Sequence, residues 1–210
     1  MKVSAPIGCV IMASGLSRRF GSNKLLADFA GQPMLCRAFA ATDTPLLAAR
    51  VVVTRSVEVK KLCEQHGVPV IFHALPGCND TVRLGLSALL DMQPDLAGCM
   101  FLPGDQPLLT LQSVEAVIRA FHSTKKRDIC RLSYAEADAS APIVGSPVLF
   151  GCSYFTQLLH LPEGKGGSVV LKQYPERIQN VPAQHRLELA DADTPQALAQ
   201  LEEAFRAQNF

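Results

Sequence analysis

A run of small and basic residues, IMASGLSRRFGSNKLL, begins within the first apolar segment of the chain and spans Ile11–Leu26. Gly15 and Gly21 let the backbone bend and approach a ligand closely. Successive backbone N–H groups in such a bend form a concave site for anions, and Arg19 and Lys24 add fixed positive charge. The spacing matches neither GxxxxGK(S/T) nor GxGxxG. We therefore predict a phosphate-binding loop of another kind, with a solvated turn as the alternative.

A single carboxylate, Asp105, lies in the segment LPGDQP immediately after another apolar run. Mg²⁺ prefers hard oxygen ligands and is usually bound by one or two carboxylates together with substrate phosphates. Asp105 is therefore predicted to hold Mg²⁺; the alternative is a turn residue that caps the helix expected from Leu111. Near the end of the chain, LADADTP offers Asp193 or Thr194 as the N-cap of the last helix, with Pro195 in its first turn.

The apolar pattern predicts the elements that must position these segments. Strands are expected at Ile7–Ala13, Arg50–Thr54, Val68–Phe72, Gly98–Leu102, Asp128–Ser133 and Pro147–Phe150. Helices are expected at Met34–Ala41, Ser56–His66, from a cap at Asn79–Thr81, at Leu111–His122 and from Thr194 or Pro195 to about Ala207. Continuous apolar strands separated by helices are typical of a mostly parallel sheet with helices on both faces.

The predicted fold class is thus α/β, doubly wound and Rossmann-like, as one domain over residues 1–210. Right-handed crossovers in such a fold place the loops that follow the strands at one edge of the sheet, where ligands bind. Both the basic loop and Asp105 follow predicted strands, so we expect them at this edge. The polar segment Tyr134–Gly145 is expected to be a mobile loop rather than a domain boundary.

The composition limits the classes of partner. Lys and Arg number 20 against 19 Asp and Glu, a net charge of +1, so no general attraction to nucleic acid or to an anionic membrane is expected. The 7 cysteines are scattered without a CxxC pair, which indicates a reducing, cytoplasmic setting. We interpret the apolar N-terminal run as a buried strand rather than a signal peptide. No run approaches the roughly 20 apolar residues that span a bilayer.

The basic loop resembles the signature of the MobA-like nucleotidyltransferases, (L/M)-A-(A/G/S)-G-x-S-x-R-(M/F)-G-x-x-K. The matching residues are Met12, Ala13, Ser14, Gly15, Ser17, Arg19, Phe20, Gly21 and Lys24. In that family the loop wraps the triphosphate of a nucleotide. The resemblance implies that Arg19 and Lys24 neutralise phosphate charge, while Arg18 occupies a variable position and is solvated.

Two further motifs extend the resemblance. GDQP resembles the metal-binding GDxP of the family, which makes Asp105 the leading ligand of Mg²⁺ and a catalytic residue with Arg19 and Lys24. DADTP resembles DIDTP, whose second aspartate can complete the metal site; this implies Asp193 as a ligand and Asp191 less strongly. The nucleotide-binding residues implied by the family motifs are Ala13, Ser14, Gly15, Leu16, Ser17, Gly21, Asp80, Thr81 and Gly104.

Three further segments resemble parts of the substrate site in the family. The segment Gly77–Leu86 resembles the nucleobase side of cytidylyl-transferring members, although an ordinary helix N-cap explains it equally well. Gly145–Phe150 matches a G-x-P-V-L-F strand near the acceptor, with Ser146 where related molybdopterin enzymes often have histidine. Glu163–Ser168 lies where those enzymes have G-D-x-G-A-R, and only Lys165 retains a cation. These departures leave the identity of the acceptor open.

The resemblance implies Mg²⁺-dependent transfer of a nucleotide to a phosphorylated acceptor, with release of pyrophosphate. The molybdenum cofactor cytidylyltransferase branch is favoured, because its loop has Ala where the guanylyl branch has Gly, and Ser14 is closer in size to Ala. This implies CTP as donor, molybdopterin as a candidate acceptor and a molybdenum hydroxylase as a candidate partner. The alternatives are a cytidylyltransferase of a sugar or polyol phosphate, and a non-catalytic carrier that delivers molybdenum cofactor to a hydroxylase.

Overall fold

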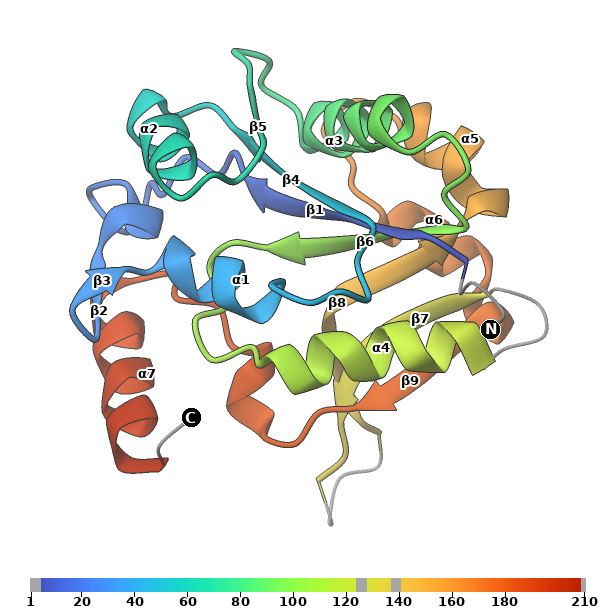
Figure 1. The fold of residues 1–210 in the computed structure, drawn as a ribbon. Coiled ribbons are helices and arrows are strands. Elements are labelled where there is room, and N and C mark those ends of the chain that lie inside the picture. The colour runs from blue at the N-terminus through green and yellow to red at the C-terminus, as the bar shows by residue number, and fades with distance from the viewer. Residues whose placement is uncertain (1–4, 124–127, 137–140, 209–210) are drawn as a thin grey trace.

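The computed structural model describes residues 5–123, 128–136 and 141–208. Its centre is a seven-stranded sheet in the order β5-β4-β1-β6-β8-β7-β9 (Figure 1). The strands are β1 (Ile7–Ala13), β4 (Ala49–Thr54), β5 (Val70–Phe72), β6 (Gly98–Pro103), β7 (Ile129–Tyr134), β8 (Ile143–Gly151) and β9 (Ile178–Pro182). A separate two-stranded hairpin is formed by β2 (Asp28–Phe29) and β3 (Gln32–Pro33).

Only β8 runs against its neighbours in this seven-stranded sheet. β1 pairs in parallel with β4 and β6, and β4 with β5, whereas β8 is antiparallel to both β6 and β7. β7 and β9 are again parallel. The predicted α/β class with a mostly parallel sheet is therefore confirmed, and β1 lies between β4 and β6 in its parallel half.

Helices cover both faces of the sheet. They are α1 (Leu35–Ala41), α2 (Val57–Gln65), α3 (Cys78–Met92), α4 (Leu111–Ser123), α5 (Phe155–Leu159), α6 (Ser168–Gln173) and α7 (Pro195–Gln208). Side chains alternate along β1: Ile11 joins a core with α1, α2, α4 and α7, and Val10 joins a second core with α3, α5 and α6. Figure 1 shows α3 and α5 on one side of the strands and α1 and α4 on the other. Among the described helices, none is long and apolar enough to cross a membrane.

The close packing of α3 onto the sheet depends on a glycine. A Cβ atom added at Gly85 would lie 2.5 Å from Cγ1 of Val10 on β1 and 3.0 Å from Cγ2 of Val53 on β4. Such distances are far inside normal van der Waals contact, so a larger residue must push the helix off the strands. The absent side chain therefore sets the position of α3, whose N-terminus faces the ligand edge.

The elements differ from the predicted ones mainly in the second half of the chain. The strand expected at Pro147–Phe150 extends over Ile143–Gly151, and β7 reaches Tyr134, so the segment expected to be a loop contributes to both strands. Residues 137–140 of that segment lie outside the described residues. The edge strand β9 was not predicted, because IQNVP is short, polar in its middle and ends in proline.

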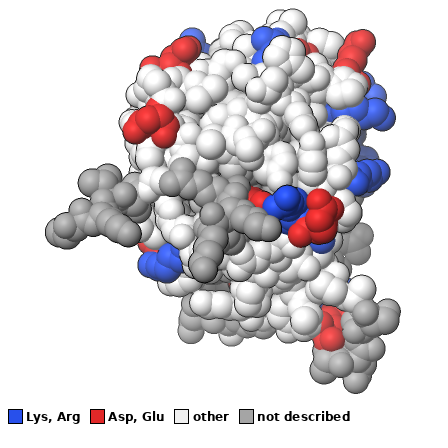
Figure 2. All heavy atoms as spheres, turned by 90° about the vertical axis from the view of Figure 1, so that its right-hand side faces the viewer, with Lys and Arg blue, Asp and Glu red and all other residues white. Residues whose placement is uncertain are grey.

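The two ends of the sheet differ in character. In Figure 1, β1 and β6 run toward the left, so their carboxyl ends lie on the left. Figure 2 shows the molecule from the right-hand side of Figure 1, and therefore shows the face at the amino ends of these strands. On that face, Lys and Arg are scattered with Asp and Glu among uncharged residues. The residues predicted to do chemistry lie at the other end.

Candidate active site

Three segments from distant parts of the chain meet at the carboxyl edge of β1 and β6. The loop after β1 is tied to the loop after β6, because the Gly104 N–H donates to the Met12 carbonyl at 3.0 Å. The segment before α7 is tied to the same place, since the Ala192 N–H donates to the Asp105 carbonyl at 2.9 Å. The backbone thus brings the basic loop, Asp105 and the DADTP segment together.

The ammonium group of Lys24 lies at the point where these segments meet. Lys24 begins the short 3-10 helix η1 (Lys24–Leu26) and is only 8% exposed. Its Nζ pairs with Oδ1 of Asp193 at 2.8 Å and with Oδ2 of Asp105. Burial by itself lowers the pKa of Lys24, but hydrogen bonds to Asp105 and Asp193 outweigh it and raise the pKa above its ordinary value. Lys24 is therefore a buried, permanently charged cation.

Asp193 is shared between two cations. Arg19, whose side chain is largely exposed, donates from Nη2 to Oδ2 of Asp193 at 2.6 Å, while Lys24 takes the other oxygen. The hydrogen bond from Lys24 holds the pKa of Asp193 below its ordinary value, and the charge of Arg19 adds to this. Asp193 does not cap α7, because Thr194 Oγ1 accepts from the Ala197 N–H at 3.1 Å. Its carboxylate is thus taken up by the two cations rather than by the cap of α7.

The loop after β1 turns sharply so that Lys24 can point inward. Ser17 has φ +50° and Gly21 has φ +80°, both left-handed conformations. The Ser17 hydroxyl accepts from the Lys24 N–H at 3.2 Å, and the Ser17 carbonyl accepts from the Phe20 N–H at 2.9 Å. At Gly15 no atom lies within 4 Å of the place of a Cβ, so its backbone is open to the cleft.

The other side of the loop is held by residues from β4 and from the end of β5. The Ser14 hydroxyl donates to the Val53 carbonyl at 3.1 Å and lies 2.9 Å from Nε2 of His73. Arg55 donates from Nε and Nη2 to the Ser14 carbonyl at 2.9 and 2.6 Å. Burial, aided by the charge of Arg55, lowers the pKa of His73. Ser14 is therefore fixed in place by three different residues.

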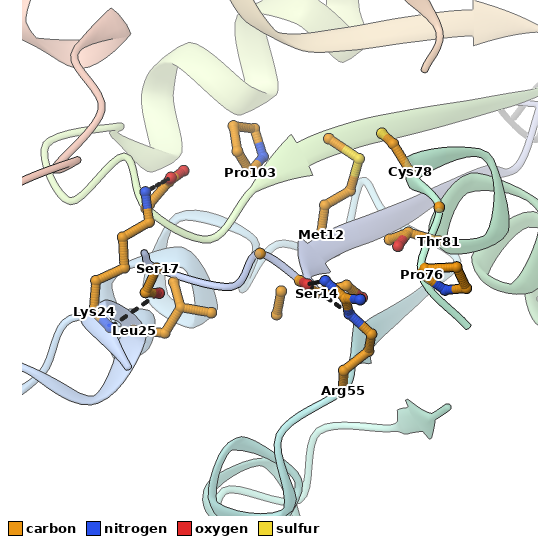
Figure 3. A pocket seen from close by; sticks show the side chains of 14 residues that line it. Met12, Ser14, Ser17, Lys24, Leu25, Arg55, Pro76, Cys78, Thr81 and Pro103 are labelled. Atoms are coloured by element: carbon orange, nitrogen blue, oxygen red, sulfur yellow. Dashed lines mark hydrogen bonds and ion pairs between the residues drawn. The ribbon is translucent and has the colours of Figure 1, made fainter. Parts of the chain in front are cut away.

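A cleft of about 280 Å³ runs between these groups. Figure 3 shows Lys24 entering it from one side, Arg55 beside Ser14, and Thr81 and Pro76 beyond. Its lining residues are Met12, Ala13, Ser14, Gly15, Ser17, Lys24, Leu25, Arg55, Pro76, Gly77, Cys78, Thr81, Pro103 and Asp105.

A second cavity of about 390 Å³ adjoins the cleft and shares Met12 and Cys78 with it. Its walls are mostly apolar and include Phe101 and Phe150. Arg131 is the one charged side chain among the described residues that line it, and its Nε donates to Oδ1 of Asn180 at 2.8 Å. A ligand with an apolar or flat part and an anionic group suits such a cavity.

Asp105 and Asp193 have the donor chemistry of a magnesium site. No group of three or more His, Cys, Asp or Glu residues suited to a metal occurs within the described part of the chain. Asp105 and Asp193, however, both reach the same ammonium nitrogen, so their oxygens converge on one place where a cation is already favoured. Two carboxylates are what Mg²⁺ usually takes from a protein, with phosphates and water completing its shell. The pair therefore fits a magnesium ion delivered with a nucleotide.

A family model described as the MobA-like NTP transferase domain matches residues 9–178, most of the chain. The chain belongs to the MobA-like NTP transferase family. The matched region includes the basic loop, Asp105, Arg55 and most residues that line the second cavity.

Two relatives of this MobA-like chain are named for different nucleotides. It is 28% identical over 116 residues to a probable molybdenum cofactor guanylyltransferase from Pyrococcus horikoshii, covering 55% of this chain and 57% of the relative. It is 27% identical over 115 residues to a 3-deoxy-manno-octulosonate cytidylyltransferase from Chlorobium phaeovibrioides, covering 53% and 44%. The chain thus matches only about half the length of these curated relatives.

Solved structures share the fold over nearly the whole chain. A nucleotidyl transferase from Methanothermobacter has a TM-score of 0.79 at 19% identity, covering 97% of this chain and 99% of its own. A CMP:2-keto-3-deoxy-manno-octonic acid synthetase complexed with CTP has a TM-score of 0.73 at 16% identity, covering 99% and 100%. Rv0371c from Mycobacterium tuberculosis, in complex with manganese, has a TM-score of 0.72 at 20% identity, covering 95% and 100%.

The MobA-like motif residues do not all lie in the cleft. The predicted catalytic, metal-binding and nucleotide-binding residues that line it are Ala13, Ser14, Gly15, Ser17, Lys24, Thr81 and Asp105, whereas Arg19 and Asp193 do not. Leu16 is 59% exposed and borders a smaller hollow, which shares Ala13, Gly15, Ser17 and Arg55 with the cleft. Asp80 lies in the first turn of α3 instead: its Oδ2 accepts from the Gly77 N–H at 3.1 Å and its Oδ1 pairs with Arg83 at 3.1 Å. Gly21 and Gly104 do not line the cleft either; Gly21 has φ +80°, and the Gly104 N–H donates to the Met12 carbonyl.

The structure decides the two capping alternatives for the motif residues differently. Thr110, not Asp105, caps α4, since its hydroxyl accepts from the Ser113 N–H at 3.2 Å. α3 starts at Cys78 with Gly77 as its N-cap, so Asn79–Thr81 lie in its first turn. There the Asp80 carboxylate accepts from the Gly77 N–H, so the helix-cap interpretation of this segment is confirmed with Asp80 as the capping side chain.

Sequence reasoning missed Arg55, His73, Gln106 and Arg131. Arg55 directly follows β4, and a parallel strand points its next residue toward the ligand edge, so this position could have been found. Gln106 donates from Nε2 to Oδ1 of Asp191 at 3.0 Å. The two residues are 85 positions apart in the sequence, so no local pattern predicts this hydrogen bond.

Proposed function

We propose that this domain transfers CMP from CTP to a phosphorylated acceptor, with molybdopterin as the preferred acceptor. The observation that carries the proposal is the buried ammonium group of Lys24 between Asp105 and Asp193, at the mouth of an open glycine-containing loop. A cation held by two carboxylates suits a site that binds both phosphates and a divalent metal ion. Family membership supports the nucleotidyltransferase class, and a structural neighbour in complex with CTP supports the donor.

In the proposed reaction, a phosphate oxygen of the acceptor attacks the α-phosphorus of CTP. A new P–O bond forms, the bond from the α-phosphorus to the α,β-bridging oxygen breaks, and pyrophosphate leaves with that electron pair. Such transfers depend on positioning and charge neutralisation more than on covalent catalysis. Lys24, Arg19 and the open amides of the loop after β1 would neutralise charge on the triphosphate, each well-aimed donor contributing roughly 3 kcal/mol.

Asp105 and Asp193 are the residues that would hold Mg²⁺. The ion would supply charge neutralisation on the phosphate oxygens. A structural neighbour in complex with manganese supports a divalent ion. Because Lys24 pairs with the same two carboxylates, nucleotide binding requires its ammonium group to turn from the carboxylates to the phosphates. Asp191 stays with Gln106, and its pKa, raised by burial and by the charge of Asp105, makes it the weaker ligand.

The proposed preference for CTP rests on Ser14. Its side chain lines the cleft and is held by the Val53 carbonyl and by His73, so it cannot swing aside to admit a larger base. A pyrimidine needs less room than a purine at this position. Ser14 therefore supports cytosine over guanine, even though one relative is named for guanylyl transfer.

The proposed acceptor suits the second cavity. Phe101 and Phe150 offer an apolar wall on which a flat ring can pack, and Arg131 offers a cation for an anionic group. A sugar or polyol phosphate would leave its hydroxyl groups against this apolar wall without partners. These contacts favour a heteroaromatic phosphate such as molybdopterin over a polyol phosphate.

Pyrophosphate release tests the proposal. CTP, Mg²⁺ and molybdopterin are incubated with the protein, and pyrophosphate is measured for the natural sequence, Asp105→Asn and the control Asp91→Asn, whose carboxylate is exposed on α3. We expect release that requires molybdopterin, falls at least about 100-fold in Asp105→Asn and is unchanged in the control. Tight binding of molybdopterin with no pyrophosphate release would instead favour the carrier.

A further inference from the structure

We propose that Arg55 reads the nucleobase and selects bases that present two adjacent hydrogen-bond acceptors, cytosine or guanine, over uracil and adenine. The inference rests on the proposed function, because it assumes that the cleft holds a nucleotide. It adds a specificity residue that lies outside the loop motif and the metal-binding motif.

The position of Arg55 separates it from the phosphate end of the cleft. Lys24 and Arg55 are the two cations that line the cleft among the described residues, and they come from different segments, η1 and the residue after β4. Figure 3 shows Arg55 beside Ser14, on the side of Pro76 and Thr81, whereas Lys24 lies on the other side of the loop. With the triphosphate at Lys24, the nucleoside extends toward Arg55.

The guanidinium group is held so that one edge stays available. Nε and Nη2 both donate to the Ser14 carbonyl, at 2.9 and 2.6 Å, which fixes the plane of the group. Within residues 5–123, 128–136 and 141–208, Nη1 has no hydrogen-bond or ion-pair partner. A guanidinium carries five N–H donors in a rigid fork, so the Nη1–Nη2 edge still presents two parallel donors.

The free edge matches only some bases. Cytosine presents O2 and N3 as neighbouring acceptors, and guanine presents O6 and N7, the pair that arginine most often binds in nucleic acids. Uracil has an N–H between its two carbonyl groups, and the amino group of adenine lies beside both N1 and N7. In either base, a hydrogen-bond donor would therefore face one of the two N–H donors of the guanidinium group. A good bidentate contact discriminates by roughly tenfold to a hundredfold.

Arg55 and Ser14 then divide the choice of base between them. Arg55 separates cytosine and guanine from uracil and adenine by their acceptor pattern, and Ser14 favours the smaller ring of the first pair. Because Arg55 also holds the Ser14 carbonyl, the two selections are made by one connected unit.

The test measures dissociation constants by calorimetry for CTP, UTP and inorganic tripolyphosphate with Mg²⁺ present. The variants are Arg55→Gln, Arg55→Lys and the remote control Arg119→Gln, whose side chain is 65% exposed on α4. We expect the natural sequence to bind CTP at least about tenfold more tightly than UTP. Both Arg55 variants should lose this difference by weakening CTP, with tripolyphosphate affinity unchanged. Thermal melting of each variant confirms that it is folded.

Two results would overturn the inference while leaving the proposed function intact. If Arg55→Gln weakens CTP, UTP and tripolyphosphate equally, Arg55 only supports the phosphate loop through Ser14. If the CTP preference over UTP is absent from the natural sequence or persists in both variants, the base is read elsewhere. If the natural sequence binds tripolyphosphate but no nucleotide, or binds none of the three ligands, the proposed function fails together with the inference.

Discussion

Lys24, which lines the cleft, and Asp193 form an ion pair of 2.8 Å, although 169 positions separate them in the chain. The pair joins the loop after the first strand to the segment before the last helix. Asp105 completes it from the loop after β6, so three segments that follow or precede central elements converge on one ammonium group. This convergence makes the separate motifs a single site.

Removing the Lys24 ammonium should abolish most of the transfer activity. In Lys24→Gln, we expect kcat/KM for CTP to fall by about 100-fold or more, because a buried donor aimed at the phosphates is lost. Arg18→Gln is the matched control, since Arg18 lies exposed in the same loop at the variable motif position. Steady-state kinetics of both variants check this. An equal loss of kcat/KM in the two would mean that the loop needs positive charge in general rather than the Lys24 ammonium group.

Asp193→Asn should destabilise the metal-free protein at neutral pH. Lys24 and Arg19 hold the pKa of Asp193 below its ordinary value, so its ionised form stabilises the folded state. That contribution is present above about pH 4 and is lost as the pH falls through the lowered pKa of the folded state. Urea unfolding in EDTA should therefore show a lower free energy of unfolding at pH 7, with a difference that shrinks in acid.

Asp191→Asn should have the opposite sign. Burial and the charge of Asp105 raise the pKa of Asp191, so its ionised form weakens the folded state at neutral pH. Asparagine keeps an oxygen that can accept from Nε2 of Gln106. We expect the free energy of unfolding to rise at pH 7 and to match the natural protein below about pH 4. A fall at pH 7 would show that ionised Asp191 is stabilised by another contact.

Ser14→Gly should shift the nucleotide preference toward GTP. Loss of the side chain opens the cleft where Val53 and His73 now hold the Ser14 hydroxyl. Competition titrations should show GTP gaining on CTP by about tenfold, whereas Ser14→Ala should keep the preference for CTP because its Cβ still fills the space. An unchanged ratio of GTP to CTP affinity in Ser14→Gly would show that Ser14 does not select the base.

The packing of α3 on the sheet predicts a strong effect at Gly85. Gly85→Val should lower the free energy of unfolding by about 1–3 kcal/mol, because a Cβ would already lie 2.5 Å from Val10. Asp91→Val introduces the same side chain at an exposed position of the same helix and should cost less. Denaturant unfolding compares the two, and an equal loss in both variants would mean that contact with the strands is not responsible.

Local signals in the sequence predicted the parallel half of the sheet and the residues that follow its strands. The apolar run Ile7–Ala13 and the basic loop after it are contiguous, so pattern and placement agree with the structure. Hydrogen bonds between residues far apart in the sequence could not be predicted from such local signals. The contact of Arg131 with Asn180 depends on β9 pairing beside β7, and the two bonds from Arg55 to the Ser14 carbonyl depend on β4 lying next to β1.

The most direct test of nucleotidyl transfer follows the fate of labelled phosphorus. CTP labelled at the α- or the γ-phosphorus is incubated with the protein, Mg²⁺ and molybdopterin, and the products are separated. We predict that the α-label enters the molybdopterin product and that the γ-label leaves in pyrophosphate. Asp105→Asn should abolish both labelled products. Release of the γ-label as inorganic phosphate, or an unlabelled acceptor with intact CTP, would contradict it.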